Sequence, residues 1–246
     1  MLRADVAAGF CDAVLTRAPS GAIECGMGQM EGAARKMAAV PLFPLPNVVL
    51  FPSAVLPLHV FEERYKTMVA DALRVKRTIA MALLRPGWEM TYYQRPAIEP
   101  VVCVGSIISH ERLPDGCFNL LLQGRTRAMI VKEYGDRPYR MAMLQTLSEP
   151  APAEIELMNH RQKMIEIFNS AAFASTPAGR QFRDMLSGPM TTAQVADLAA
   201  FNILDGVELK QALLAERDVN RRVERVVQEL EKLSPLLYSE EKAAWN

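Results

Sequence analysis

Histidine and cysteine are the residue types in this chain that could hold a metal ion or act as a nucleophile, and the chain has three and four of them. His59 and Glu62 begin the H-x-x-E of an inverted zinc motif, but a glutamate stands where the motif needs its second histidine. His110 begins H-E-x-x-H, but the last position is a proline, which would also end the helix that the motif requires. His160 is far away in the sequence. We therefore expect no metal site and no cofactor.

The pairing of Cys117 with His110 is the arrangement that could support nucleophilic catalysis. Cys117 follows the turn at residues 114–116 and His110 lies on the strand before that turn, so an imidazole could reach the thiol across a hairpin. Nothing in the sequence marks an oxyanion hole or an orienting acid. Cys103 lies within the apolar run VVCVG, which is typical of an inert core cysteine. A cysteine-dependent hydrolase using Cys117 and His110 stays open as an alternative.

Motifs for nucleotide binding and for serine catalysis are missing from the printed sequence. It contains no G-x-x-x-x-G-K-[ST] and no G-x-S-x-G, and the glycines at 21, 26, 28 and 32 do not have dinucleotide-binding spacing. We therefore expect a protein that is not an enzyme.

The charge balance gives no overall attraction to nucleic acid or anionic lipid, because 28 basic residues match 28 acidic ones. Arg125, Arg127 and Lys132 form a short basic stripe on one predicted strand, which we interpret as solvated strand charges, with an RNA-binding face as the alternative. No apolar run approaches the roughly eighteen residues of a membrane helix. With no secretory signal and no C-x-x-C spacing, we expect a reduced cytoplasmic protein.

The stretch from Pro41 to Asp71 organises the predicted fold. Its opening prolines suit an edge strand or an extended entry, and a second apolar run follows from Val55 to Phe61. From Glu62 the apolar positions recur with helical spacing. Further strands are predicted over 78–84, 101–109, 118–122, 126–134 and 139–147, with a long aromatic loop from Trp88 to Pro100 and a bulge or bend at Gly124.

The character of the chain changes at the proline-rich segment 149–152, after which every pattern is helical. Thr176-Pro177 starts one helix, Thr191 or Thr192 caps another, and Asp205 with Glu208 suggests a capping box for the next. We predict an α+β fold: a small curved antiparallel β pseudo-barrel with one helix over 39–149, then a helical bundle over 150–246. Residues 1–38, rich in alanine and glycine, are interpreted as a disordered leader.

Four stretches of this sequence resemble the LON N-terminal domain, the substrate-binding domain of ATP-dependent Lon proteases, which also occurs on its own. They are FPLPNVVLFPSAVLPLHVFEERY from residue 43, VGSIIS at 104–109, LLLQGRTRAMI at 120–130 and ERDVNRRVERVVQELEKL near the end. The resemblance covers about residues 40–233 and implies a PUA-like β-rich half. Full-length Lon proteases continue into ATPase and protease modules, and we expect this chain to lack them.

The expected function is a non-catalytic binding module for unfolded or extended polypeptide, acting in protein quality control or as an adaptor. The resemblance implies substrate recognition, and the apolar and aromatic residues suggest how a chain would be bound. The methionine content, 14 residues, also suits an adaptable apolar surface, although core filling explains it as well. A protease or chaperone partner and homo-oligomerisation stay open, and we expect no membrane and no nucleic-acid partner. The candidate contact residues are Phe43, Leu45, Leu58, Phe61, Trp88, Tyr92 and Tyr93, of which Leu58 and Phe61 also suit a core position.

Overall fold

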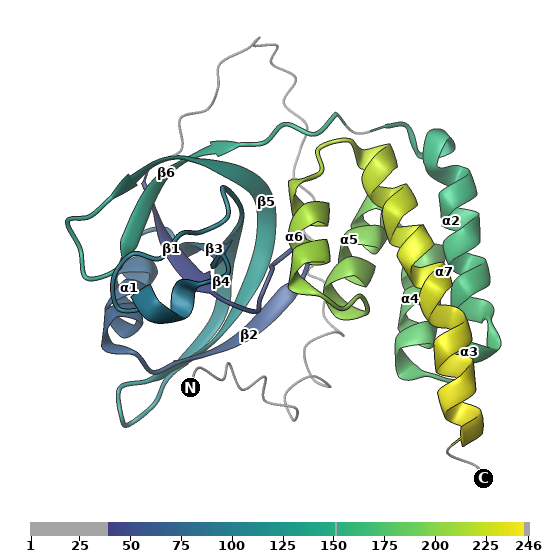
Figure 1. The fold of residues 1–246 in the computed structure, drawn as a ribbon, viewed down its shortest axis with the longest axis horizontal. Helices are drawn as coiled ribbons and strands as arrows, with labels where there is room; N and C mark the ends of the chain where they lie inside the picture. Colours follow the sequence, from purple (N-terminus) through teal and green to yellow (C-terminus); the bar gives the residue numbers. More distant parts are fainter. Residues whose placement is uncertain (1–38, 151, 244–246) are drawn as a thin grey trace.

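The computed structural model describes residues 39–150 and 152–243, with side chains described up to residue 233. The leader predicted over 1–38 lies outside the described residues. The β-rich half contains β1 (Val40–Leu45), β2 (Val55–Val60), α1 (Glu63–Arg74), β3 (Thr78–Leu83), a 3₁₀ helix (Trp88–Thr91), β4 (Val101–Arg112), β5 (Phe118–Tyr134) and β6 (Arg140–Thr146). The helical half contains α2 (Glu154–Asn169), α3 (Ala171–Ala174), α4 (Pro177–Ser187), α5 (Thr192–Asn202), α6 (Val207–Ala215) and α7 (Val219–Ala243). Figure 1 shows the two halves side by side.

The described strands form one sheet in the order β2-β5-β4-β3-β1-β6, and β5 also pairs with β6. All pairs are antiparallel except β1 with β3. The long strand β5 makes the curvature possible, because its first part pairs with β2 and its second part pairs with β6. The expected α+β class is confirmed: the sheet curves back on itself but is not a regular closed barrel.

The prolines of β1 favour an edge strand or an extended entry, but β1 lies inside the sheet. It lies between β3 and β6, but its partner changes along its length. Pro41 falls where β1 pairs with β6 alone, Pro44 falls where it pairs with β3 alone, and only Leu42 pairs on both sides. Each proline therefore lies where only one neighbouring strand is paired, which explains why an internal position tolerates it.

Gly124 lies where the loop after β1 crosses β5. A Cβ atom at this position would lie 2.0 Å from the carbonyl oxygen of Phe51, so the close approach needs glycine. The backbone N–H of Gly124 donates to the carbonyl oxygen of Ala54 (2.8 Å), and that of Ser53 donates to the carbonyl oxygen of Gly124 (3.0 Å). The β4–β5 register shifts next to this crossing, so the bulge expected at Gly124 is confirmed.

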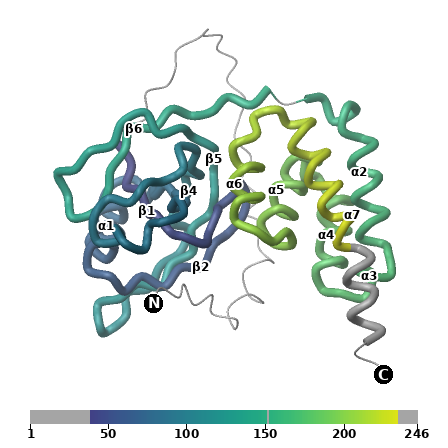
Figure 2. The backbone as a smooth tube through the Cα atoms, viewed as in Figure 1, coloured from purple at the N-terminus to yellow at the C-terminus, as the bar shows by residue number. Residues whose placement is uncertain are grey.

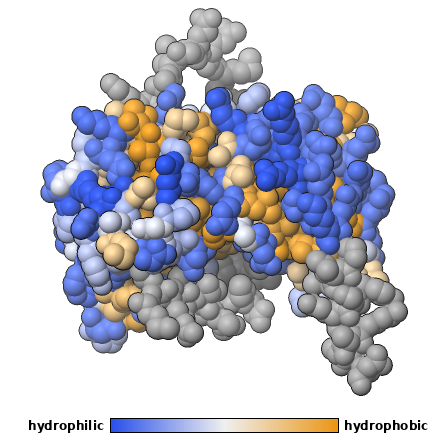
Figure 3. All heavy atoms as spheres, viewed as in Figure 1, coloured by the Kyte–Doolittle hydropathy of each residue, from blue (hydrophilic) through white to orange (hydrophobic). Residues whose placement is uncertain are grey.

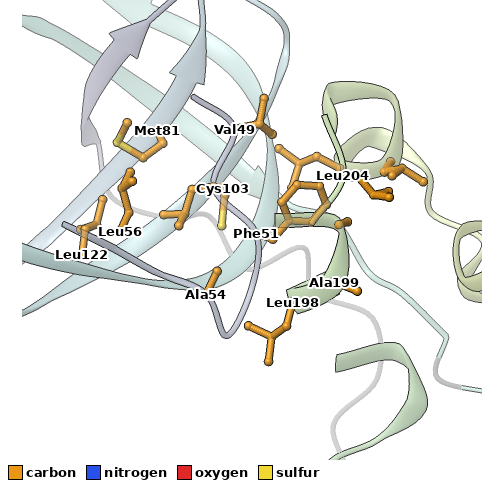
Figure 4. Close-up of a cluster of buried hydrophobic side chains, with 14 of the residues drawn as sticks. Val49, Phe51, Ala54, Leu56, Met81, Cys103, Leu122, Leu198, Ala199 and Leu204 are labelled. Atoms are coloured by element: carbon orange, nitrogen blue, oxygen red, sulfur yellow. The ribbon is translucent and has the colours of Figure 1, made fainter. Parts of the chain in front are cut away.

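Two buried clusters lie on opposite faces of the sheet. The smaller one takes side chains from five strands and from Ile98 but none from a helix, so the curved sheet covers it by itself. The larger one begins on the other face, around Met81 and Cys103, and continues without a break into the helical half. At the crossing of the two halves, Phe51 lies beside Leu204 and Ala199 (Figure 4). The two halves therefore share one core.

The chain leaves the sheet and later returns to it. After β6 it runs to α2 on the far side of the helical half, and α5 and α6 then lie next to the β-rich half, with α6 against β4 (Figure 2). As predicted, Thr176 caps α4 with Pro177 in its first turn, and Thr191 caps α5 in a full capping box. The capping box predicted at Asp205 is wrong, because α6 has Gly206 as its N-cap without a side-chain hydrogen bond.

A buried ion-pair network joins β5 to three helices. Arg127 on β5 donates two hydrogen bonds to Asp197 on α5 and one, of 3.0 Å, to the carbonyl oxygen of Leu214 on α6. Arg222 on α7 lies 3.1 Å from Asp197 and 2.9 Å from Glu149. The expectation that Arg127 is a solvated strand charge is wrong, since the residue is only 3% exposed. Buried charges need partners, and these partners hold the helices against the sheet.

Candidate functional site

Three of the seven side chains selected from the sequence lie in the core. Phe43, Leu45 and Leu58 are each at most 6% exposed, and the Phe43 ring packs 4.5 Å from that of Tyr65 on α1. A bound chain would have to open the larger buried cluster to reach them. This finding corrects the expectation that they form an exposed surface, and they take no further part in the site. For Phe43 and Leu45 the expectation was tied to an edge position for β1, but β1 lies between β3 and β6.

The other four candidates are accessible. Phe61, between β2 and α1, is 45% exposed and stacks against His59 with ring centroids 6.1 Å apart. Trp88, Tyr92 and Tyr93 lie on segment 85–100 and form a chain of edge-on ring contacts, with centroid distances of 5.6 and 5.2 Å. Tyr93 is 91% exposed, whereas the other two rings are half-buried. We call these three side chains the aromatic ridge.

Segment 85–100 contains the long irregular loop that the sequence predicts from Trp88 to Pro100, with one 3₁₀ turn in it. Its ends are held together by an antiparallel bridge between Leu84 and Ile98. Close to that bridge, the guanidinium of Arg140 on β6 donates to the carbonyl oxygen of Pro96 (2.6 Å). The aromatic ridge is therefore carried by a loop that is tied to the sheet at several points.

An apolar cleft of about 430 Å³ lies on one side of the ridge, at the junction with α6. It is lined by Trp88, by Val207 and Ala212 of α6, and by three prolines from the loops around β1, β3 and β4. Glu99 and Glu208 also line it, so the lining is mostly but not wholly apolar. The Gln211 side chain, which also lines it, donates to the carbonyl oxygen of Val101 (2.9 Å) and is thereby satisfied. Figure 3 shows apolar residues gathered over α5 and α6 beside the β-rich half. We call this space the Trp88 cleft.

A second cleft, of about 350 Å³, lies on the other side of the ridge. Its lining includes four arginines and four tyrosines: Arg64, Arg95, Arg137, Arg140, Tyr65, Tyr92, Tyr93 and Tyr139. Leu84 lines both clefts, and the ring contact between Trp88 and Tyr92 spans the ridge between them. The two clefts are therefore immediate neighbours. We call the second one the Arg–Tyr cleft.

Three of the four arginines in this cleft have carboxylate partners. The pairs are Arg64–Glu62 (3.1 Å), Arg137–Asp71 (2.8 Å) and Arg140–Glu133 (2.7 Å). Arg95 donates only to the carbonyl oxygen of Tyr134 (3.2 Å) and has no carboxylate in ion-pair range among the described residues. Four guanidinium groups thus meet three carboxylates, which leaves the cleft with a surplus of positive charge.

Arg64 is held between two rings, 4.6 Å from the centroids of Tyr65 and of Tyr92. Its Nη2 atom is buried and makes no hydrogen bond to any described residue. Burial raises the pKa of Tyr65 to about 12. Burial, together with the hydrogen bond that its hydroxyl donates to Glu62, also raises the pKa of Tyr92. Both phenols therefore stay neutral near pH 7, and no tyrosinate cancels the positive charge of the cleft.

These four arginines were not among the contact residues predicted from the sequence. The run Arg137-Pro-Tyr-Arg140 and the arginine that follows Tyr92 and Tyr93 were signals of this composition. They could not be combined from the sequence, because the arginines come from α1, segment 85–100, the β5–β6 connection and β6.

Comparison with known families identifies the domain. Residues 39–232 match the family model described as the ATP-dependent protease La (LON) substrate-binding domain. The chain belongs to this family. The resemblance drawn from the four sequence stretches is thereby confirmed, and the family match is to a substrate-binding domain, which is non-catalytic.

Relatives of this LON domain include complete Lon proteases. The Lon protease of Dictyoglomus thermophilum is 24% identical over 190 residues, which cover 76% of this chain and 23% of the relative. That of Roseiflexus castenholzii is 26% identical over 199 residues, with 80% and 24% covered. The chain thus spans about a quarter of the length of the relatives it matches.

Solved structures show the same fold. The N-terminal domain of a Mycobacterium avium complex Lon protease has a TM-score of 0.63 at 14% identity, with 79% of this chain and 98% of the other covered. A Lon N-terminal domain protein from Xanthomonas campestris has a TM-score of 0.55 at 22% identity, with 78% and 98% covered. At these identities the likeness concerns the fold.

Cys117 and His110 do not show the features of a catalytic dyad in this LON domain. His110 pairs in register with Leu120 on β5, whereas Cys117 precedes that strand. The Cys117 backbone N–H donates to the carboxylate of Asp115 (3.0 Å). Desolvation, followed by the neighbouring Asp115, raises the pKa of the Cys117 thiol. A raised pKa disfavours the thiolate that a nucleophile needs, which argues against a hydrolase that uses Cys117 and His110.

Neither a metal centre nor a membrane span is found in the part of the LON domain that the structure describes. Within residues 39–150 and 152–243, no three histidine, cysteine or acidic side chains gather as a metal site would require. The helices in those ranges are too short or too polar to cross a bilayer.

Proposed function

We propose that this LON domain binds unfolded or extended polypeptide and that apolar side chains of the bound chain enter the Trp88 cleft. The observation that carries the proposal is the cleft itself, an apolar space of about 430 Å³ beside a half-buried tryptophan. Two exposed apolar side chains on the same segment, Met90 (90%) and Tyr93 (91%), extend the accessible surface. Membership of a substrate-binding family supports a polypeptide as the occupant.

Binding is through side-chain pockets and not through addition of a strand at β1. β1 has neighbours on both sides, so it offers no free edge. β2 pairs with β5 alone among the described strands, but Pro57 interrupts its row of backbone donors. An extended chain that places alternate side chains in the cleft needs only one accessible face and a few apolar residues. The domain would therefore favour segments that a folded protein buries.

The test is binding of a permanently unfolded polypeptide, fluorescein-labelled α-lactalbumin that has been reduced and alkylated, measured by fluorescence anisotropy. We expect Trp88→Ala to weaken binding about tenfold, because truncating a central aromatic contact typically costs more than 1 kcal/mol. Ala212→Glu should weaken it similarly, because it fills part of the cleft and adds a third carboxylate to the lining beside Glu99 and Glu208. Native α-lactalbumin should bind far more weakly than the unfolded form.

Phe61→Ala is the matched control, because Phe61 is an exposed aromatic residue outside both clefts. It should leave the affinity unchanged. The chain has two tryptophans, Trp88 and Trp245, so Trp245→Phe leaves Trp88 as the single indole, whose emission reports occupation of the cleft. Equal affinity of the wild type, Trp88→Ala and Ala212→Glu for the unfolded protein would exclude the Trp88 cleft as the binding site.

The cellular role that we infer is protein quality control or delivery of clients as an adaptor in the cytoplasm, with a protease or chaperone as partner and without ATPase or protease activity of the domain's own. A pull-down from native lysate with wild type and Trp88→Ala, compared by mass spectrometry, identifies clients as the proteins lost with the variant. Degradation of casein by the purified chain, with contaminating proteases excluded, would contradict a purely binding role.

A further inference from the structure

The Arg–Tyr cleft has the composition of a carboxylate site and not of an apolar pocket. Its lining contains four guanidinium groups, and a guanidinium matches the two oxygens of a carboxylate. Lysine, whose ammonium lacks this planar fork, does not line it. The arginines are held in place by rings and by their own partners, so a ligand would meet side chains that are already ordered.

Arg95 gives this cleft unused binding capacity. It lacks a carboxylate partner among the described residues, and its one hydrogen bond goes to the carbonyl oxygen of Tyr134. Arg95 is exposed, so a ligand in the cleft can reach its remaining N–H groups. The Nη2 atom of Arg64 also makes no hydrogen bond to a described residue, but it is buried and would meet a ligand only if its surroundings moved. A positively charged donor without a carboxylate partner is best satisfied by an anionic oxygen.

The position of the cleft links it to the proposed polypeptide site. Trp88 and Tyr92, whose ring centroids lie 5.6 Å apart, line the Trp88 cleft and the Arg–Tyr cleft respectively. An extended chain advances about 3.3 Å per residue, so a segment crossing the ridge would reach both clefts within roughly five residues.

We propose that the Arg–Tyr cleft binds a carboxylate of the same polypeptide whose apolar side chain occupies the Trp88 cleft. This proposal rests on the proposed function and deepens it, because it assigns the client a two-part signal: apolar residues followed or preceded closely by an acidic residue or a carboxyl terminus. The apolar part supplies affinity through burial, and the carboxylate sets position and selectivity through charge-assisted hydrogen bonds.

The test uses fluorescein-labelled ten-residue peptides that contain Leu-Leu-Ser-Asp-Asp and end in an amide, with Asn-Asn in place of Asp-Asp as the neutral counterpart. We expect the wild-type chain to bind the acidic peptide about tenfold more tightly at low salt, an advantage typical of a charged hydrogen bond. The Asn-Asn peptide with a free carboxyl terminus distinguishes a terminal carboxylate from a side-chain carboxylate. High salt should reduce the advantage of whichever carboxylate is bound.

Arg95→Gln is the decisive variant, because Arg95 is exposed and has no ion pair to lose. It should reduce the preference for the Asp-Asp peptide over the Asn-Asn peptide to less than about threefold, without changing the affinity for the Asn-Asn peptide. Arg225→Gln, at an exposed position of α7, makes the same charge change outside the cleft and should leave the advantage intact. Circular dichroism spectra that match the wild type establish that both variants are folded.

The outcomes separate this proposal from the proposed function. If both peptides bind equally and Trp88→Ala weakens both, the carboxylate site is overturned and polypeptide binding stands. If neither peptide nor the unfolded protein binds, both proposals fail. If a short single-stranded RNA displaces the acidic peptide at lower concentration than the unlabelled peptide does, the cleft is a nucleic-acid site and the carboxylate assignment is overturned.

Discussion

Arg127 on β5 and Asp197 on α5 are separated by 70 positions in the chain, yet they form a buried two-point ion pair with N–O distances of 2.7 and 3.0 Å. Their side chains are 2% and 6% exposed. With Arg222 and Glu149 they form a balanced group of two positive and two negative charges, so removing either residue leaves one charge in excess in the core. Arg127 also donates a hydrogen bond to the carbonyl oxygen of Leu214 on α6, which ties the helix that lines the Trp88 cleft to the sheet.

The first prediction concerns this pair. Arg127→Leu or Asp197→Leu should each lower the free energy of unfolding by about 3–5 kcal/mol, because the buried network with Arg222 and Glu149 is left with one uncompensated charge. The double variant should cost clearly less than the sum of the two, since it leaves Arg222 and Glu149 as a balanced pair. Urea denaturation of the four proteins measures this coupling. Arg125→Leu, at an exposed neighbouring position, should stay within about 0.5 kcal/mol of the wild type. Strictly additive losses would contradict the prediction.

The second prediction concerns the crossing of the loop after β1 over β5. Gly124→Ala should destabilise the domain by at least about 2 kcal/mol, because the added Cβ atom meets the backbone carbonyl of Phe51 at 2.0 Å and the backbone must move. Gly116→Ala lies at a turn with φ +82°, where the nearest atom to an added Cβ is the flexible Lys66 Nζ at 3.8 Å, an ordinary contact. It should therefore cost only about 1–2 kcal/mol, from the left-handed conformation. Thermal unfolding of the two variants compares them, and a smaller loss at 124 than at 116 would refute the close-approach argument.

The third prediction separates two helix starts that look alike in the sequence. Thr191→Ala should cost about 1 kcal/mol, because Thr191 accepts the capping hydrogen bond at the start of α5. Asp205→Ala should change the free energy of unfolding by less than about 0.5 kcal/mol, because α6 starts at Gly206 without a side-chain cap. Urea denaturation curves decide between them. Equal losses would mean that Asp205 caps α6 in solution.

The fourth prediction is a loss of stability at alkaline pH. Burial raises the pKa of the Cys103 thiol to about 12, whereas an unfolded cysteine titrates near about 8.5. A pKa raised by folding means that the neutral thiol stabilises the fold fully below pH of about 8.5, and that this contribution is lost as the pH rises toward 12. In this pH range, ionisation of Cys103 lowers the free energy of unfolding by up to about 1.4 kcal/mol per pH unit.

Unfolding free energies measured between pH 8 and 10.5 under reducing conditions test this slope. Cys103→Ala should be less stable at pH 8 but should lose stability more slowly as the pH rises, because it lacks the titrating thiol. Parallel curves for the two proteins would show that the Cys103 thiol is not the group responsible.

The sequence alone was sufficient for most of the local structure, although not for the capping box predicted at Asp205. Helical periodicity after Glu62, the hairpin turn at 114–116 and the cap at Thr176 each depend on residues that are neighbours in the chain, and the structure contains all three. The long motif around the first strands was specific enough to indicate the family that residues 39–232 match. These features need no knowledge of which distant segments meet.

Only the tertiary structure decided which of these residues are accessible. β1 is internal because β6 pairs with its first residues and β3 pairs with its last ones. Phe43 and Leu45 are therefore buried, whereas the proline-rich sequence around them suggested an exposed edge. Arg127 is buried because its carboxylate partner comes from a helix 70 positions away. The Arg–Tyr cleft combines side chains from four separate segments around the aromatic ridge. Burial and long-range pairing are properties of the packed chain, and a linear pattern does not contain them.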